Sequence, residues 1–264
     1  MILKILLKNG NFYKMIRKIK NIIKKSNIYK IINFWKDISF KDFLNFEKVF
    51  LFQKVYPYTM VGYQRLSNVY DLAKKAEQEK LEGVFAECGV WKGGCAAVMG
   101  FVAQKTGFGR KIWMFDSFEG LPEPTEKDGK IAKDYASNKA GGNLKAIDKC
   151  VGPIEDVKKI FFEKLRLDEN NIIIKKGWFQ DTLPESKEKI GKIALLRLDG
   201  DWYESTKVCL DNLYDDVIIG GYIILDDYGH WEGARRALDE FFTERKIKPE
   251  LIKIDYTGVY FIKP

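Results

Sequence analysis

Two pairs of aspartates are the residues of this sequence best placed to do chemistry. Asp199 and Asp201 follow the apolar run "IALLRL", and Asp226 and Asp227 follow the run "YIIL". Two adjacent acids after a buried strand would repel each other without a cation. A cluster of carboxylates suits a hard cation such as Mg²⁺ better than Zn²⁺, because Mg²⁺ prefers oxygen ligands. Such an ion polarises bound hydroxyl groups, and a further acid beside the reacting oxygen can take its proton.

The second acid, Asp201, also has a purely structural interpretation. A helix is predicted to begin near Tyr203, and Asp is a favoured residue at a helix N-cap. If the chain stays extended past the strand, the side chains of Asp199 and Asp201 lie on the same side. One of them then holds a metal ion while the other reaches the substrate. Both interpretations stay open at this point.

Residues near these acids give weaker signals. His230, the only histidine, follows the acid pair in "DDYGHW" and is either a base near the substrate or a loop residue. Trp91, Trp202 and Trp231 flank the same motifs, and such rings either stack on a sugar or adenine or pack in the core. The acids therefore carry more of the prediction than the aromatic rings do.

A glycine turn earlier in the chain predicts a nucleoside site. The stretch "FAECGVWKGG" at 85–94 ends a predicted strand and opens a helix, and its glycines permit a tight turn close to a ligand. It matches neither the dinucleotide fingerprint nor a phosphate loop. The next strand, "KIWMFD", ends on Asp116, where an acid accepts hydrogen bonds from ribose hydroxyls. S-adenosylmethionine fits these features better than NAD or ATP does.

The elements that position these residues alternate between strand and helix. Apolar strands and helical segments follow one another from about residue 60 to 245, which predicts a parallel sheet covered on both faces. Ligands of such sheets bind beyond the carboxyl ends of the strands. The last two strands, "ELIKID" and "GVYFIK", flank a Thr-Gly turn and predict an antiparallel hairpin. The polar segment 119–155 interrupts the alternation and is expected to act as a mobile lid that shapes the choice of acceptor.

The charge of the chain is concentrated at its N-terminus. Residues 1–36 hold ten of the 45 Lys and Arg and none of the 37 Asp and Glu, so the other 228 residues carry 35 basic and 37 acidic side chains. The body lacks the spread of basic residues that a nucleic-acid-binding domain presents. The basic segment 1–36 is amphipathic and predicts either peripheral contact with an anionic membrane or partner, or packing on its own domain.

The remaining composition predicts a cytoplasmic protein, at the inner face of the membrane if the basic segment binds lipid. The four cysteines have no metal-ligand spacing and read as reduced packing residues. No apolar run reaches the roughly 18 to 20 residues that span a bilayer, and the N-terminus lacks the features of a secretory signal.

Six motifs in order make the chain resemble the macrocin O-methyltransferase-like family. They are "PYTM" with "RL", "AECGVWKGG", "FDSFEGLPEP", "KGWFQDTLP", "RLDGDWYEST" and "GGYIILDDYG", and the resemblance covers about residues 56–245. The resemblance implies a Rossmann-like class I methyltransferase of α/β class with N-terminal helices and a mostly parallel seven-stranded sheet that ends in the antiparallel hairpin. It divides the chain into a helical extension at 1–55 and a catalytic domain at 56–264. We also expect a homo-oligomer.

The resemblance assigns roles to particular residues. It implies a Mg²⁺ ion held by Asp199, Asp226 and Asp227, with Asp201 as the general base and His230 as a second catalytic candidate. The implied S-adenosylmethionine site comprises Tyr58, Thr59, Met60, Glu87, Gly89, Gly93, Asp116, Ser117, Asp181 and Asp199.

The implied activity is the Mg²⁺-dependent transfer of a methyl group from S-adenosylmethionine to a sugar hydroxyl of a glycan, a glycolipid or a nucleotide sugar. Two alternatives remain. One keeps the cofactor and the metal but methylates a phenol or catechol. The other is a membrane-docked binding module that has the same fold and no turnover.

Overall fold

The computed structural model describes residues 31–32 and 34–264 of the chain, and it divides into two compact units, Met1–Asn45 and Phe46–Pro264. Most of the basic segment predicted at 1–36 lies outside the described residues. Helix α4 (Phe40–Phe43) belongs to the first unit, and helix α5 (Phe46–Val55) belongs to the second. The second unit thus begins ten residues before the boundary predicted at 56.

A seven-stranded sheet forms the centre of the second unit, in the order β3-β2-β1-β4-β5-β7-β6. The first five strands in this order pair in parallel, while β7 is antiparallel to both β5 and β6. This confirms the predicted mostly parallel sheet with a C-terminal hairpin. The strands are β1 (Val84–Cys88), β2 (Ile112–Asp116), β3 (Ile172–Lys176), β4 (Ile193–Leu198), β5 (Val217–Leu225), β6 (Ile252–Lys253) and β7 (Val259–Ile262).

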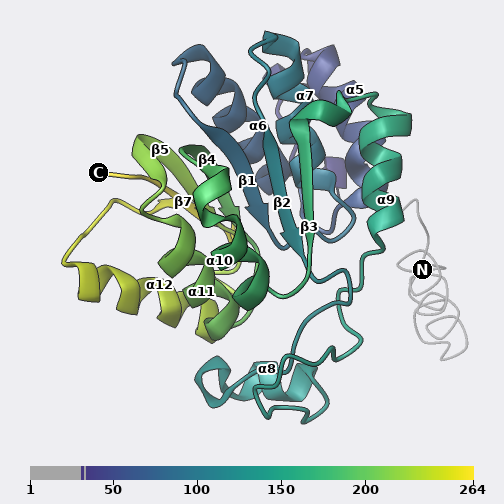
Figure 1. The fold of residues 1–264 in the computed structure, drawn as a ribbon. Coiled ribbons are helices and arrows are strands. Elements are labelled where there is room, and N and C mark those ends of the chain that lie inside the picture. The colour runs from purple at the N-terminus through teal and green to yellow at the C-terminus, as the bar shows by residue number, and fades with distance from the viewer. Residues whose placement is uncertain (1–30, 33) are drawn as a thin grey trace, which may run out of the picture. The chain divides into compact units, whose positions relative to one another are not determined.

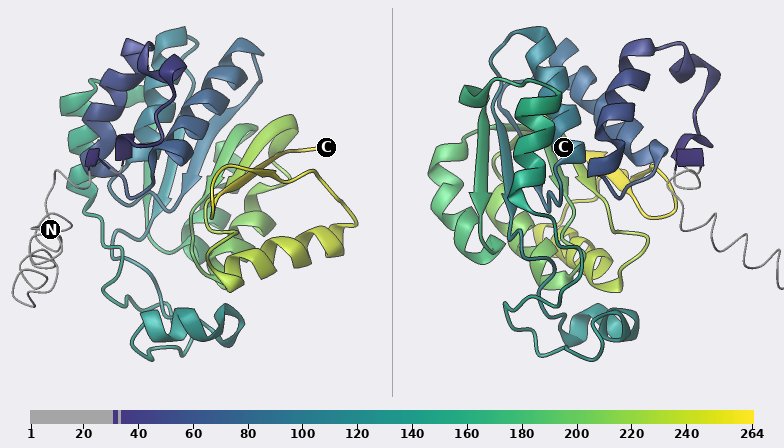
Figure 2. Two further views of the ribbon diagram at one scale, coloured as in Figure 1. Left: turned by 180° about the vertical axis from the view of Figure 1, so that it is seen from behind. Right: turned by 90° about the vertical axis from the view of Figure 1, so that its right-hand side faces the viewer.

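Helices cover both faces of this sheet, as Figures 1 and 2 show. On one face lie α6 (Tyr63–Gln78) and α7 (Gly94–Thr106), with α5 packed on α7. On the other face lie α10 (Phe179–Ile190), α11 (Tyr203–Leu213) and α12 (Glu232–Arg245). Shorter elements are η1 (Tyr56–Tyr58), α9 (Ile154–Lys158), which continues into the π-helical turn η3 (Lys159–Lys164), and η4 (Glu169–Asn171).

The apolar strands are buried because both faces of the sheet are covered. Every residue of β4 is buried, including the charged Arg197 in the middle of "IALLRL". A large hydrophobic cluster of described residues lies between the sheet and α10 to α12. The sequence patterns did not predict α10, because this helix contains Pro184, a residue that usually interrupts helices.

The segment 119–155 packs on the starts of α11 and α12. It contains η2 (Glu126–Asp128) and α8 (Gly129–Tyr135), and it lies beyond the carboxyl ends of the strands (Figure 1). A second hydrophobic cluster joins the segment to α11 and α12 and comprises Leu121, Ala132, Ala136, Ile147, Trp202, Trp231 and Ala234. The segment thus has a small core of its own. Its predicted role as a mobile lid stays a prediction.

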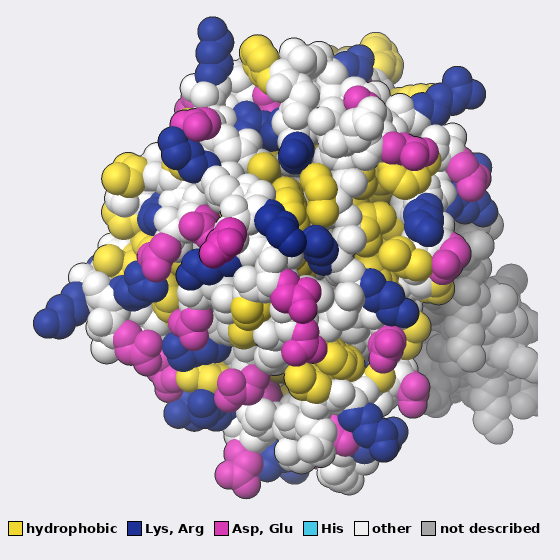
Figure 3. Space-filling model, in the orientation of Figure 1, with side chains coloured by type: hydrophobic (Ala, Val, Ile, Leu, Met, Phe, Trp, Pro, Cys, Tyr) yellow, Lys and Arg dark blue, Asp and Glu magenta, His cyan; other side chains and the backbone are white. Residues whose placement is uncertain are grey.

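The surface carries both signs of charge. On the face in Figure 3, Lys and Arg side chains are interspersed with Asp and Glu over the described part of the chain. Among the described residues no helix is both long enough and apolar enough to cross a membrane.

The turn between β1 and α7 depends on Gly89. Its φ of +86° is in the left-handed region, and a Cβ placed there would lie 1.8 Å from the carbonyl oxygen of Asp199. The same residue donates its backbone N–H to Phe115 O at 2.9 Å. Gly89 therefore allows the loops after β1 and β4 to touch.

We predict that Gly89→Ala lowers the free energy of unfolding by about 3 kcal/mol, because it adds steric overlap to the cost of a left-handed alanine. Gly107→Ala is the matched control, since Gly107 has a φ of +72° but nothing within 4 Å of the added Cβ. This control should lose only about 1 kcal/mol. Urea denaturation of both variants measures the difference, and equal losses would show that the contact with Asp199 is unimportant.

Candidate active site

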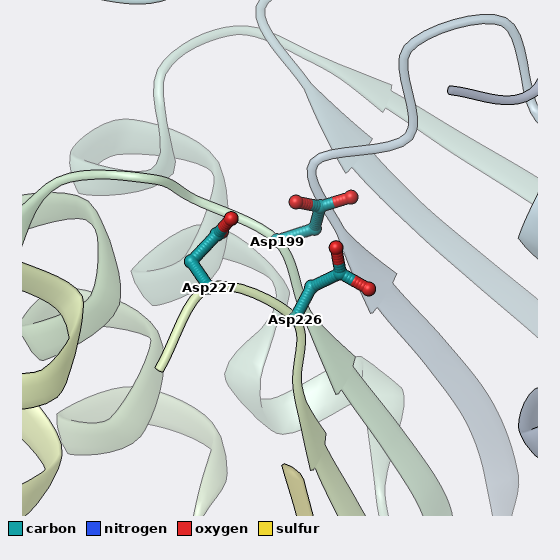
Figure 4. Close-up of side chains that lie close together, drawn as sticks. All are labelled: Asp199, Asp226 and Asp227. Carbon is teal, nitrogen blue, oxygen red and sulfur yellow. The ribbon is translucent and has the colours of Figure 1, made fainter. Parts of the chain in front are cut away.

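The register of the sheet brings the predicted acids together. Leu198 of β4 pairs with Leu225 of β5, so the residues that follow them emerge side by side at the carboxyl edge. Asp199 N donates to Cys88 O, and Asp226 N donates to Leu198 O, each at 2.9 Å. Oxygens of Asp199, Asp226 and Asp227 lie within 4.8 Å of one another (Figure 4). Three carboxylates so placed form a donor set that suits a hard divalent cation.

The guanidinium of the buried Arg197 pairs with three of the acidic side chains at this site. Its Nη1 donates to Glu87 Oε1 at 2.5 Å and lies 2.9 Å from Asp199 Oδ2, and its Nη2 donates to Asp226 Oδ1 at 2.6 Å. The side chain of Arg197 is only 2% exposed. Removing a partner from such a buried pair leaves an uncompensated charge. The guanidinium therefore holds the ends of β1, β4 and β5 in one arrangement.

A second arginine, Arg65 on α6, joins the same network. Its Nη1 forms a short ion pair with Asp226 Oδ2, and its Nε donates to Asp255 Oδ2 at 3.0 Å. Both oxygens of Asp226 therefore accept from arginines. Each oxygen keeps a further acceptor position, so these bonds are compatible with a metal ion.

Carboxyl groups outnumber guanidinium groups in this network of described residues. Two guanidiniums face six carboxylates, which are Glu87, Asp199, Asp201, Asp226, Asp227 and Asp255. Burial, followed by the charge of Asp199, raises the pKa of Asp201 to about 8. Burial and the neighbouring Asp201 and Asp199 raise the pKa of Asp227 well above its usual value. Burial raises the pKa of Asp199 as well. A divalent cation beside these groups would stabilise their ionised form.

Asp201 does not cap the helix that follows it. The N-cap of α11 is Trp202, which has no side-chain capping bond, and the N–H of Tyr203 donates instead to Asp128 Oδ1 at 2.5 Å. The expected extended geometry at Asp201 is also wrong, because its φ is +58°. Its backbone N–H donates to Asp227 Oδ2 at 3.1 Å, and its Oδ1 accepts from Trp231 Nε1 at 2.6 Å.

Two clefts meet at the carboxylates. The first lies between the glycine turn, the end of β2 and the start of α10. The second lies between the acids, α6 and the segment 119–155. Both are lined by Met60, Cys150, Asp199 and Asp201. The two clefts therefore adjoin at these residues.

The predicted cofactor residues divide into those that line the first cleft and those that do not. Met60, Gly89, Asp116, Ser117 and Asp199 line it. Tyr58, Thr59, Glu87, Gly93 and Asp181 are absent from its lining. Asp181 is exposed in the first turn of α10, and Glu87 is buried beneath the site against Arg197.

Two of the residues outside the cleft nonetheless shape the glycine turn. Gly93, with a φ of +88°, is the N-cap of α7. Thr59 lies over the start of the same helix, since a Cβ on Gly94 would be 2.6 Å from Thr59 Cβ and from Tyr58 O. The segment around Thr59 and the glycine turn are thus in contact.

Asp116 organises the glycine turn from the end of β2. Its Oδ2 accepts the N–H groups of Val90 at 2.7 Å and Trp91 at 2.8 Å, and its Oδ1 accepts that of Phe118 at 2.7 Å. Oδ1 keeps a further acceptor position toward the cleft.

His230 and the tryptophans have different places. His230 is exposed and lines the second cleft beside Asp227 and Trp231. Trp91 lines the first cleft and donates its indole N–H to Val151 O. Trp202 is buried and lines neither cleft. The core interpretation therefore holds for Trp202, while Trp91 and Trp231 face the site.

The sequence reasoning missed both arginines and one wall of the first cleft. Arg197 stands inside an apolar strand, and a lone charge in such a run is the signal that indicates a buried ion pair. Arg65 was noted only as part of a motif. Trp178, Phe179 and Gln180 line the first cleft, and they went unassigned because α10 was not predicted.

The fold and site define a class I methyltransferase. The structure of the O-methyltransferase NovP superposes with a TM-score of 0.68 at 34% identity, over 78% of this chain and 82% of that one. CalS11, a calicheamicin methyltransferase, has a TM-score of 0.59 over 97% of this chain and 93% of its own, and at 17% identity it supports the fold alone.

The profile of the macrocin O-methyltransferase (TylF) family matches residues 53–263, so the chain belongs to this family and is an O-methyltransferase. Demethyldecarbamoylnovobiocin O-methyltransferase of Streptomyces niveus is 36% identical, covering 77% of this chain and 75% of the relative. Mycinamicin III 3''-O-methyltransferase of Micromonospora griseorubida is 30% identical, covering 77% and 78%.

We predict that Arg197→Met lowers the free energy of unfolding by about 4 kcal/mol, because it strands buried carboxylates. Arg236→Met is the matched control, since the Arg236–Glu240 pair is exposed and solvent screens it, so this variant should unfold at nearly the same denaturant concentration as the unmodified protein. Guanidinium denaturation followed by circular dichroism measures both. A loss below about 1 kcal/mol for Arg197→Met would contradict a central role for the buried guanidinium.

Proposed function

We propose that this protein transfers the methyl group of S-adenosylmethionine to a sugar hydroxyl in a Mg²⁺-dependent reaction. The observation that carries the proposal is that two clefts share Asp199 and Asp201. Methyl transfer is an in-line displacement, so donor and acceptor must approach from opposite sides of one point. The shared carboxylates mark that point.

The first cleft suits the methyl donor. Among the described residues, its lining contains three aspartates, Asp116, Asp199 and Asp201, and neither Lys nor Arg. This lining disfavours a polyphosphate and favours a cationic nucleoside such as S-adenosylmethionine. Trp178 and Phe179 offer apolar surface for a planar base. The free acceptor position of Asp116 Oδ1, beside Ser117, suits a ribose hydroxyl.

Asp199, Asp226 and Asp227 would hold the Mg²⁺ ion. A hard cation at this place polarises an acceptor hydroxyl and helps to orient a sugar diol. The fit rests on three converging oxygens and on the excess of carboxylates over guanidiniums in the network. Arg197 and Arg65 keep Asp199 and Asp226 oriented.

Asp201 is the proposed general base. It is half-buried and lines both clefts, so a hydroxyl group held in the second cleft can reach its carboxylate. His230 lines only the second cleft, near its exposed side. We therefore assign proton removal to Asp201 and contact with the acceptor to His230.

The second cleft suits a sugar acceptor. It combines carboxylates that accept hydrogen bonds from hydroxyl groups with aromatic rings, Tyr135, Trp231 and Tyr256, that pack on the apolar faces of a sugar. The names of the relatives support this choice, since one is a mycinamicin III 3''-O-methyltransferase and another methylates a rhamnosyl-tetracenomycin at the 4' position. A catechol offers a similar diol and is the competing acceptor class.

A product assay tests the proposal. The protein, S-adenosylmethionine and Mg²⁺ are incubated with a panel of deoxysugar glycosides and, separately, with catechols, and methylated products are identified by mass spectrometry. We expect transfer to glycosides, and a loss of about 100- to 10,000-fold in kcat for Asp201→Asn with the affinity for S-adenosylmethionine kept.

The control for this assay is Asp211→Asn, which removes an exposed carboxylate on α11 that pairs with Lys207 and should leave kcat unchanged. If the protein methylates catechols but not sugars, the proposed sugar acceptor is wrong and the acceptor is a catechol. Full activity in Asp201→Asn would exclude it as the base.

The metal site has a separate test. We predict that Asp227→Asn raises the Mg²⁺ concentration for half-maximal activity at least about tenfold, because one of three charged ligands is lost. Titration calorimetry with MgCl₂ on the protein freed of metal by EDTA gives a readout independent of turnover. Equal Mg²⁺ binding by Asp227→Asn and by Asp211→Asn would contradict the assignment.

A further inference from the structure

We propose that Trp231 is a positioning residue for Asp201 and that the segment 119–155 holds Trp231 in place. The inference rests on the proposed function, in which Asp201 removes the acceptor proton. It gives the segment a role beyond covering the acceptor: the segment helps to set the direction in which the base points.

The contact that carries the proposal is the hydrogen bond from Trp231 Nε1 to Asp201 Oδ1, at 2.6 Å. In the described part of the chain, Trp231 supplies the side-chain hydrogen bond to this carboxylate, whereas Asp199 and Asp226 are held by Arg197. With Oδ1 bound to the indole, Oδ2 is the oxygen left for a hydroxyl group. Without the indole the carboxylate could rotate about its last torsion, which is broad for Asp.

The backbone of Asp201 is held in place by a bond that does not involve its side chain. Its φ of +58° is an uncommon conformation for a residue other than glycine. Its N–H donates to Asp227 Oδ2 at 3.1 Å, which ties the backbone to the acid cluster but leaves the side chain unrestrained. The indole supplies the missing restraint.

Trp231 is itself held by aromatic packing. It is 6% exposed and precedes α12 as its N-cap residue. The centroid of its ring lies 4.8 Å from the ring centroid of Trp202, in an edge-to-face arrangement. It lies 5.5 Å from the ring centroid of Tyr135, the last residue of α8. Tyr135 also contacts Trp202, at 6.5 Å. Two rings from different elements thus fix the plane of the indole.

The segment 119–155 is anchored at the starts of both helices. Trp202 Nε1 donates to Pro122 O at 2.9 Å, and Tyr203 N, in the first turn of α11, donates to Asp128 Oδ1. Asp128 also lies against the start of α12, because a Cβ on Gly233 would be 1.9 Å from its Oδ1. Its Oδ2 accepts from Thr125 within the segment. The segment therefore connects the residues before α11 with those before α12, where Asp201 and Trp231 lie.

A pair of matched substitutions tests the proposal on the full-length protein with S-adenosylmethionine, Mg²⁺ and a glycoside that the enzyme methylates. Trp231→Phe and Trp202→Phe each remove one indole N–H from the same aromatic cluster. Trp231 donates to the base, whereas Trp202 donates to the carbonyl oxygen of Pro122. Trp202→Phe keeps an aromatic ring beside Trp231, and the bond from Tyr203 N to Asp128 still anchors the segment, so Trp231 should stay in place. We expect kcat to fall about tenfold for Trp231→Phe and less than about twofold for Trp202→Phe, with similar thermal midpoints and with KM for both substrates within about twofold.

The same substitution in the Asp201→Asn background separates positioning from general damage. If Trp231 acts through Asp201, Trp231→Phe should cause no further loss of kcat in that background. A tenfold loss that persists there, or equal losses in Trp231→Phe and Trp202→Phe, would overturn the inference while leaving the proposed function intact. Full activity in Asp201→Asn alone would overturn both.

Discussion

The buried guanidinium of Arg197 is the interaction on which the site depends. It stands in the otherwise apolar strand β4 and reaches three carboxylates, of which Glu87 belongs to β1, Asp199 follows β4 and Asp226 follows β5. A charge this deep is tolerated only when it is paired and hydrogen-bonded. Because Glu87, Asp199 and Asp226 supply those bonds, the arrangement of the acids is tied to the stability of the sheet itself. The acid cluster is thus preorganised before any ligand arrives.

The geometry of the neighbouring loops follows from this arrangement. The backbone carbonyl of Asp199 contacts Gly89, so the glycine turn lies directly against the acid cluster. Asp116 then fixes the other side of the turn through three backbone N–H groups. The two clefts meet at Asp199 and Asp201 for this reason. The neighbouring carboxylates repel one another when no cation is bound. The same carboxylates favour the binding of a metal cation and of a positively charged sulfonium donor.

Sequence reasoning succeeded where a signal is local and repeated along the chain. The alternation of apolar strands and helices predicted the sheet, and the position of Asp116 after a strand predicted its place at the edge of the first cleft. It failed where local signals conflict with the tertiary structure. Pro184 concealed α10, and with it the wall formed by Trp178, Phe179 and Gln180. The N-cap interpretation of Asp201 was plausible from its neighbours alone, yet Asp128, distant in sequence, provides the bond to α11.

The sequence by itself determined the class of fold, the strand ends that carry the acids and the family to which the chain belongs, because strand periodicity and short motifs are properties of neighbouring residues. Only the tertiary structure decided which acid faces which partner. Arg197 and Glu87 are 110 residues apart, and Trp231 and Asp201 are 30 apart. Such pairs form through sheet register and the packing of an inserted segment, and no local pattern encodes either. The orientation of the proposed base is therefore a result of folding and could not be derived from its motif.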